Sequence, residues 1–230
     1  MRLARILVLA SAALIVTAGA AQADPVALST LLNGGSVHIG DKTFTDFSFQ
    51  CLQGNCAGEG VTPANITVDA FIDAAGVYIL QFGGDMLSLT PVDFKLQYSV
   101  AASAGLIVMI DQSFNLTSVG AGGSIGIGEQ VYSGGFAPGG VTEAHSSIGF
   151  VTGGAGDFED PAPEGDDLLI TPGRAKLYVE KDVNIAPLPG TLLGTSILKQ
   201  SFHQTVPEPA SLLLLGSGLT GLALWRRRAS

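Results

Sequence analysis

The chain has 230 residues, of which 47% are hydrophobic and 13% charged, so it is long and apolar enough to bury a sizeable core and is not intrinsically disordered. Its 31 glycines and 11 prolines favour many short strands joined by turns over long helices. Between Asp24 and Val206 there are nineteen acidic and six basic residues, a net charge of −13 that argues against nucleic-acid binding.

The first 23 residues have the pattern of a secretory signal peptide. Two basic residues, Arg2 and Arg5, precede an apolar run from 6 to 18. Ala21 and Ala23 then form the small-x-small pattern that signal peptidase accepts. We therefore expect a signal helix over residues 1–23, cleavage after Ala23, and a mature chain that begins at Asp24. The alternative is a retained membrane helix, for which the run is short.

The exported part that follows is predicted to be rich in strands. A short helix ends near Leu32, before Asn33-Gly34-Gly35, and a hairpin follows with its turn at residues 40–42 and its next strand contributing Phe44, Phe47 and Phe49. Polar and apolar residues alternate over 93–100 and 66–73, as in strands with one buried face. Further strands are expected at 36–39, 43–50, 76–82, 106–117, 144–152, 175–183 and 196–206.

Eight or more strands with no helix of ten residues indicate an all-β domain, a β-sandwich that is possibly of the jelly-roll type. No linker divides this region, so residues 24–205 are predicted to form one exported β domain between two terminal segments.

The two cysteines, Cys51 and Cys56, lie in a chain that is predicted to leave the cytoplasm, which favours a local disulfide. Two thiols without a neighbouring histidine do not complete a zinc site, and a redox motif has two intervening residues rather than four.

A Gly-x-Ser-x-Gly match at residues 122–126 places Ser124 in the position of a hydrolase nucleophile, with Asp157 and His203 in the chain order of a triad. A nucleophile elbow requires a helix after the serine, and the glycines and proline between 128 and 140 disfavour one. We therefore expect no triad and no enzymatic activity.

An acidic cluster over 157–167 is a weak candidate for Ca²⁺ binding through Asp157, Glu159, Asp160, Asp166 and Asp167, although it lacks the spacing of an EF-hand. A solvated loop is the preferred interpretation. The scattered histidines (His38, His145 and His203) show no metal-binding spacing, and no nucleotide-binding motif is present, so we expect no cofactor and no resident metal. The sortase-like string at 188–192 is interpreted as a turn.

The last 25 residues, 206–230, have three parts. Val206, Pro207, Glu208 and Pro209 precede an uncharged run over 210–225, which would span about 24 Å as a helix. Trp225 and the basic residues Arg226, Arg227 and Arg228 close the chain as a membrane stop, which by the positive-inside rule stays in the cytoplasm. We expect a single transmembrane helix here.

This tail closely resembles the PEP-CTERM sorting signal, in which Pro207-Glu208-Pro209 is the motif that gives the family its name. The resemblance implies a Gram-negative bacterium and processing by an exosortase, with the helix as a temporary anchor in the inner membrane. The expected partners are then signal peptidase, the exosortase, the inner membrane during sorting and possibly exopolysaccharide.

The leading hypothesis is a non-catalytic surface or extracellular-matrix protein that is sorted by an exosortase and linked to exopolysaccharide or biofilm. The alternative is a secreted carbohydrate-binding or carbohydrate-active β-sandwich. The chain has few aromatic platforms for sugars, with four tyrosines and one tryptophan that lies in the membrane segment.

Overall fold

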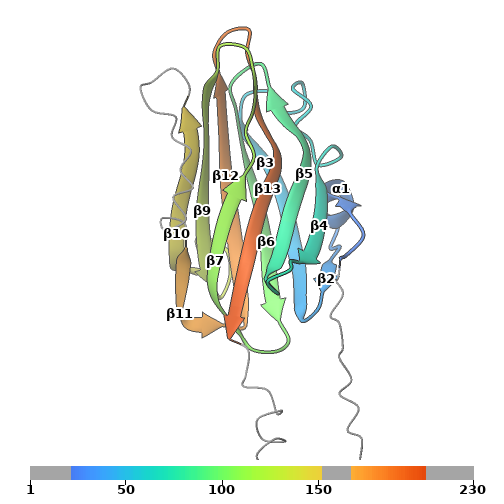
Figure 1. Cartoon of the computed structure of the whole chain (residues 1–230), viewed down its shortest axis with the longest axis vertical. Helices are drawn as coiled ribbons and strands as arrows, with labels where there is room; N and C mark the ends of the chain where they lie inside the picture. Colours follow the sequence, from blue (N-terminus) through green and yellow to red (C-terminus); the bar gives the residue numbers. More distant parts are fainter. Residues whose placement is uncertain (1–21, 152–166, 206–230) are drawn as a thin grey trace, which may run out of the picture.

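The computed structural model describes residues 22–151 and 167–205, which form two antiparallel β-sheets packed face to face (Figure 1). The elements in chain order are β1 (Val26–Ala27), α1 (Leu28–Leu31), β2 (Val37–Ile39), β3 (Lys42–Gln53), β4 (Thr67–Ile72), β5 (Tyr78–Ser88), β6 (Val92–Ala102), β7 (Leu106–Phe114), β8 (Thr117–Val119), β9 (Gly123–Ser133), β10 (Val141–Val151), β11 (Leu168–Arg174), β12 (Lys176–Pro187) and β13 (Leu192–Thr205). The predicted all-β sandwich is confirmed.

The first sheet, sheet A, has the strand order β1-β4-β5-β13-β7-β11, with β8 also paired to β13. The second, sheet B, has the order β10-β9-β12-β6-β3-β2. From β5 onward the chain passes repeatedly between the two sheets, so most neighbours in each sheet, such as β5 with β13 and β6 with β12, are distant in sequence. In Figure 1 the strands β5, β13 and β7 lie in front of sheet B.

The core is built from every second residue of the strands, as the alternating pattern predicts. On β6, Phe94, Leu96, Tyr98 and Val100 are each at most 1% exposed and face sheet A. Aromatic rings from both sheets meet at the centre, where the centroids of Tyr98 and Phe82 are 5.7 Å apart. Such tilted ring contacts add to the free energy of burying the rings.

The β2–β3 hairpin forms as predicted, with Val37 opposite Phe44. Its turn contains only Gly40 and Asp41, so the prediction that Lys42 belongs to the turn is wrong. Lys42 begins β3 and is 1% exposed. Its Nζ donates to Asp41 Oδ1 at 2.7 Å and lies 4.1 Å from the ring centroid of Tyr78, which compensates for the burial of the amine.

A bulge in β3 explains how Phe44 and Phe47, three residues apart, are both buried. Strict alternation would place them on opposite faces of the sheet. Asp46, with φ of 57°, adds a residue between the pairs Thr45–Ser99 and Ser48–Gln97, which resets the alternation. The Asp46 carboxylate accepts a hydrogen bond from Ser99 Oγ at 2.6 Å, which holds the bulge.

Three strands were not predicted: the two-residue β1, and the longer strands β9 and β11. On β9 the buried residues Ile125, Ile127 and Val131 alternate with less buried positions that include the half-buried Gly126 and Gly128. Glycine is depleted in strands, so the glycines obscured a pattern that the pairing of β9 with β10 and β12 enforces. The expected strand over 106–117 is divided into β7 and β8.

The described part of the chain begins and ends at the same pole of the sandwich (Figure 1). At its start, the backbone N–H of Ala23 donates to Ala70 O on β4 at 2.7 Å. At its end, Thr205 of β13 pairs with Leu106 of β7.

The expected signal helix and C-terminal membrane helix lie outside the described residues, apart from Gln22 and Ala23. Within the described ranges, no helix is long and apolar enough to cross a membrane.

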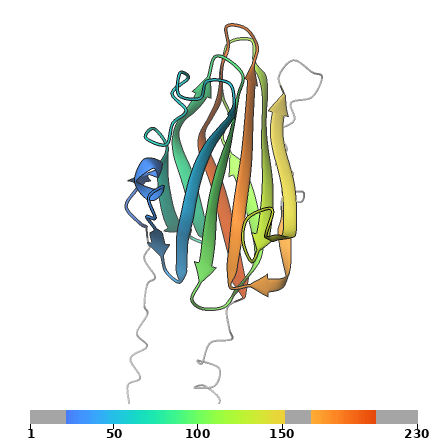
Figure 2. The same ribbon diagram turned by 180° about the vertical axis from the view of Figure 1, so that it is seen from behind.

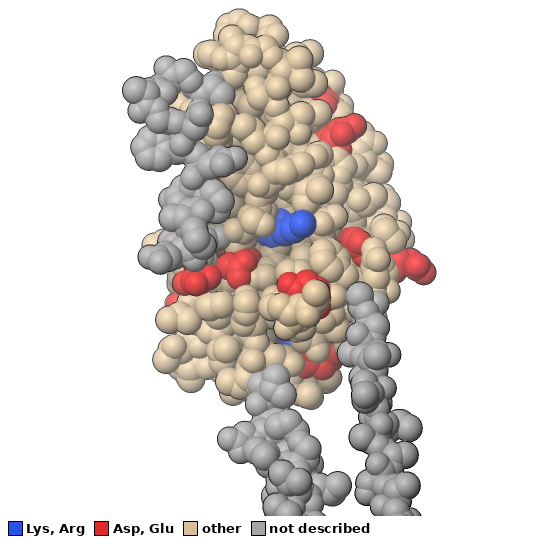
Figure 3. Space-filling model, viewed as in Figure 1, with Lys and Arg blue, Asp and Glu red and all other residues tan. Residues whose placement is uncertain are grey.

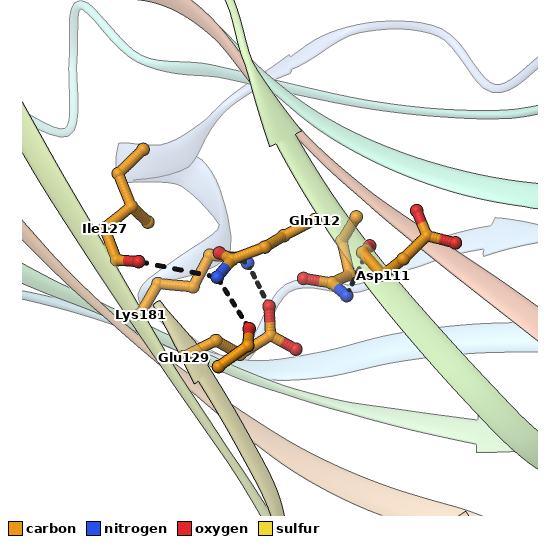
Figure 4. Close-up of polar contacts among 7 residues, drawn as sticks. Asp111, Gln112, Ile127, Glu129 and Lys181 are labelled. Atoms are coloured by element: carbon orange, nitrogen blue, oxygen red, sulfur yellow. Dashed lines mark hydrogen bonds and ion pairs between the residues drawn. The ribbon is translucent and has the colours of Figure 1, made fainter. Parts of the chain in front are cut away.

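A buried polar cluster links the two sheets inside the otherwise apolar core (Figure 4). Lys181 of β12 and Glu129 of β9, both at most 1% exposed, form an ion pair with Nζ and Oε2 2.5 Å apart. Gln112 of β7, on sheet A, accepts a hydrogen bond from Lys181 Nζ at 2.8 Å. It also donates to Ser146 Oγ of β10 at 2.9 Å. Buried charges require such partners, because an unpaired one is costly to remove from water.

Replacing Lys181 with Met should lower the free energy of unfolding by about 3–5 kcal/mol, because it leaves the Glu129 carboxylate buried without its cation. The double variant Lys181→Met/Glu129→Leu should recover most of that loss, since both charges are then absent. Urea denaturation of the full chain in detergent measures both. A double variant no more stable than the single one would contradict this role of the ion pair.

Candidate functional site

The outer face of sheet B presents an almost continuous array of polar side chains. Cross-strand register places His145 of β10, Gln130 of β9, Glu180 of β12, Gln97 of β6 and Ser48 of β3 in one row. Ser48 Oγ donates to Gln97 Oε1 at 2.8 Å, and Gln97 Nε2 donates to Glu180 Oε2 at 2.6 Å. These hydrogen bonds therefore hold three of the five side chains in the row, those of Ser48, Gln97 and Glu180, in fixed positions.

The next row consists of Ser147, Gly128, Asp182 and Lys95. Lys95 Nζ lies 2.7 Å from Glu180 Oε1 and so connects the two rows. Because the Glu180 carboxylate favours the charged amine, the pKa of Lys95 is raised. The rows thus share one network of fixed donors and acceptors.

Asp182 is paired with a second carboxyl group, that of Asp93 on β6. Partial burial, the hydrogen bond to Asp93 and repulsion by its charge together raise the pKa of Asp182 to about 6. The folded state therefore holds this proton more tightly than the unfolded chain does. The resulting contribution to stability is complete below the ordinary value of 3.8 and is lost as the pH rises through about 6.

A groove of about 520 Å³ runs along this face between β10 and β12. Its floor is β9, where Gly126 and Gly128 contribute no side chain. Its walls carry polar groups from both neighbouring strands: Thr142, His145, Glu180, Asp182 and Asn184. The groove exists because two positions of the polar array are glycine.

The loop between β9 and β10 folds against the same face (Figure 2). Phe136 in this loop contacts the ring of Tyr178 edge to face, with centroids 5.1 Å apart. Lys176 Nζ lies 4.7 Å from the Tyr178 ring centroid and 3.3 Å from Asp46 Oδ2. The Phe136–Tyr178 contact places the loop over the end of the face where Tyr132 and Tyr178 pair.

The outer face of sheet A is different, with isolated charged groups on a mostly uncharged surface (Figure 3). It holds a serine, a histidine and an aspartate in contact: Ser201 Oγ is 3.3 Å and Asp111 Oδ2 is 2.9 Å from His203 Nε2. In a hydrolase triad, the serine and the carboxylate contact different ring nitrogens. Here both contact Nε2, so the histidine cannot relay a proton between them.

Ser124, the other candidate nucleophile, lies within β9, and no helix follows that strand. His38 bonds to Ser36 and Thr43, and His145 is on the groove wall. The string over 188–192 is a turn, as predicted, with Thr191 N donating to Leu188 O at 2.9 Å.

The predicted disulfide is present, joining Cys51 and Cys56 at 2.02 Å between the sulfurs. It closes the loop that follows β3. Of the weak Ca²⁺ candidates, only Asp167 lies in a described range, and Asp157, Glu159, Asp160 and Asp166 lie outside. Within the described ranges, no group of three or more histidine, cysteine or acidic side chains is arranged to hold a metal ion.

Most residues of the terminal signals also lie outside the described ranges: Ala21, the motif from Val206 to Pro209 and the membrane stop from Trp225 to Arg228. Ala23, the residue before the predicted cleavage site, is described and packs against the core beside β4. Signal cleavage after it stays a prediction.

Comparisons with known proteins concern two parts of the chain, the C-terminal segment and the β-sandwich. Residues 205–228 match the model of the PEP-CTERM protein-sorting motif, so the chain carries this motif, as its sequence predicts. The match is consistent with an exosortase substrate and implies export with membrane anchoring during sorting. It starts at Thr205, the last residue of β13.

No curated protein sequence gives a significant match. Among solved structures, that of TmCBM61 in complex with beta-1,4-galactotriose aligns with 69% of this chain and 85% of its own. The identity is 10% and the TM-score is 0.23, too low to support a conclusion about this chain.

The groove residues were not found from the sequence. One signal was present: in the segment 176–184, side chains at every second position are polar, which predicts one solvated face of a strand. That pattern does not identify the neighbouring strands. Asp182 lies on β12, and both β6 and β9 are distant from β12 in the sequence. The proximity of Asp182 to Asp93 and Gly128 is therefore visible only in the folded structure.

Replacing Asp93 with Asn should lower the pKa of Asp182 from about 6 toward 3.8, because the neighbouring negative charge is removed. Some elevation should remain, since the partial burial is unchanged. An NMR titration of the aspartate carboxyl carbons measures this, with Asp85→Asn on sheet A as the control. If the titration of Asp182 were the same in Asp93→Asn, the two carboxyl groups would not interact.

Proposed function

We propose that this chain is a non-catalytic component of the cell surface or extracellular matrix, sorted by an exosortase and associated with exopolysaccharide. The observation that carries the proposal is the PEP-CTERM motif at residues 205–228, directly after a β-sandwich that ends at Thr205. A motif that implies export, joined to a domain with a polar groove, suits a protein that acts outside the cytoplasm by binding.

The strand order supports a finer description of the fold. Strands β5-β13-β7-β11 in sheet A face β6-β12-β9-β10 in sheet B, which is the order of an eight-stranded jelly roll. Jelly rolls occur in lectins and other binding domains. The fold is therefore compatible with a binding role, and the case for one rests on the groove itself.

The common pole of the two described ends supports the same proposal. While a C-terminal segment holds the precursor at the membrane, the pole at which the described part of the chain begins and ends (Figure 1) would face the bilayer. The groove lies on a side face of sheet B, parallel to the strands. It is therefore accessible both before and after the anchor is removed.

The contacts between the candidate catalytic groups favour the absence of catalysis. The carboxyl groups of Asp93 and Asp182 are in hydrogen-bond contact, whereas glycosidases keep their two carboxyl groups about 5 Å or more apart to admit the substrate. The Asp111–His203–Ser201 cluster converges on a single ring nitrogen. Neither arrangement has the geometry of an acid and base pair.

Replacing Glu208 with Ala, or Pro207 and Pro209 with Ala, should leave export intact but retain the protein in the inner membrane. The wild type should lose an epitope placed after Ser230 and reach the outer envelope or medium in a strain with an exosortase. Fractionation and immunoblotting measure both. Wild-type protein that kept the epitope in that strain would reject sorting by this motif.

The purified full chain should release no reducing ends from the polysaccharide of the producing bacterium, since neither the Asp93–Asp182 pair nor the Asp111–His203–Ser201 cluster is arranged as an acid and base pair. A reducing-sugar assay over the pH range 4–8 tests this. Release that disappeared in the Asp182→Asn variant would overturn the non-catalytic assignment and favour a carbohydrate-active enzyme.

Carbohydrate binding is a second candidate function, and the groove favours it. Sugar sites are concave and place several fixed polar groups around the ligand. The groove on sheet B meets both conditions, with hydrogen-bonded rows of side chains beside a glycine floor.

A further inference from the structure

The groove on sheet B is open because of the residues at its floor. A Cβ atom added at Gly126 would meet no atom within 4 Å, and at Gly128 it would meet only Asp182 at ordinary contact distance. Neither glycine has a left-handed backbone conformation, so the chain could carry other residues there without strain. The backbone does not require glycine at these positions, whereas an open groove does.

The length of the floor suits a chain-like ligand. Gly126, Gly128 and Gln130 lie on one face of β9, and the four residue steps between the first and last cover about 13 Å. A linear molecule lying along the strand would meet Asn184, Asp182 and Glu180 in turn on the β12 wall. On the β10 wall it would meet His145 and Thr142.

The walls offer both donors and acceptors. The amides of Gln130 and Asn184 do both, as does the Thr142 hydroxyl, while the carboxylates of Glu180 and Asp182 accept. Hydroxyl groups also donate and accept, so a polyhydroxylated ligand can use every wall position. The Gln97 and Lys95 contacts hold Glu180 in place before any ligand arrives, which reduces the entropy lost on binding.

The charge of the site discriminates among polysaccharides. Glu180, Asp182 and Asp93 are near one cation, Lys95, which is already bound to Glu180. Over residues 24–206 as a whole, acidic residues outnumber basic ones by nineteen to six. Polymers that carry carboxylate, sulfate or phosphate groups would be repelled.

We propose that the groove formed by Gly126 and Gly128 between β10 and β12 is a binding site for an uncharged polysaccharide, with Gln130, Glu180, Asp182 and Asn184 as its hydrogen-bonding contacts. This inference rests on the second candidate function and specifies its site and ligand class. Binding along the floor of β9 does not depend on processing of the C-terminal motif.

The test fills the groove without disturbing the fold. Gly126→Gln and Gly128→Gln each add a side chain to open space on an exposed strand face. The matched control is Ser113→Gln, at an exposed position on the opposite sheet. Full-length proteins in detergent are compared by affinity electrophoresis in gels that contain polysaccharide from the producing bacterium. Anion exchange separates that polysaccharide beforehand into neutral and acidic fractions.

We expect the neutral fraction to retard the wild type and Ser113→Gln equally. Each groove variant should bind at least tenfold more weakly, a difference of about 1.4 kcal/mol. Unchanged circular dichroism and melting temperature of the variants would show that binding, rather than folding, is lost.

Three results would overturn the proposal: no retardation by the neutral fraction, stronger retardation by the acidic fraction, or retardation that filling the groove leaves unchanged. These results are separate from the sorting experiment. A protein that is exported and processed but fails to bind would leave the sorting proposal intact and remove only this site.

Discussion

The structure depends on one constraint: the consecutive strands β12 and β13 each supply a central strand to a different sheet. Strand β12 lies between β9 and β6 in sheet B, and β13 lies between β5 and β7 in sheet A. Without these two strands each sheet would be split, with unpaired backbone groups along β6 and β9 in sheet B and along β5, β7 and β8 in sheet A. The sandwich is therefore complete only when the chain is present as far as Thr205, where the match to the sorting motif begins.

Strand β12 also connects the interior of the domain to its candidate site. Lys181 points inward to the ion pair with Glu129, whereas its neighbours Glu180 and Asp182 point outward to the groove. Because successive side chains of a strand lie on opposite faces, fixing one fixes the register of the others. The buried hydrogen bond from Lys181 to Gln112 of sheet A thereby helps to align the polar rows on the opposite side of sheet B.

The two faces of the sandwich differ in the degree to which their polar groups are organised. On sheet B, the side chains of Ser48, Gln97, Glu180 and Lys95 form a chain of short contacts beside an open groove. On sheet A, the charged groups are scattered over a mostly uncharged surface (Figure 3). Preorganised polar groups bind a ligand at a lower entropic cost, so sheet B is the more suitable binding face.

The sequence by itself determined the C-terminal sorting motif, the disulfide and the all-β class, because each depends on residues that are close together in the chain. Cys51 with Cys56 and Pro207-Glu208-Pro209 are local patterns, and the alternation over 93–100 is local too. The glycine-rich β9 was missed, since glycine removes the alternating signal that identifies a strand. Only the tertiary structure decided the strand order, the buried pair Lys181–Glu129 and the groove. Each of these joins strands tens of residues apart, and the pairing of such strands depends on packing of the whole core rather than on any local pattern.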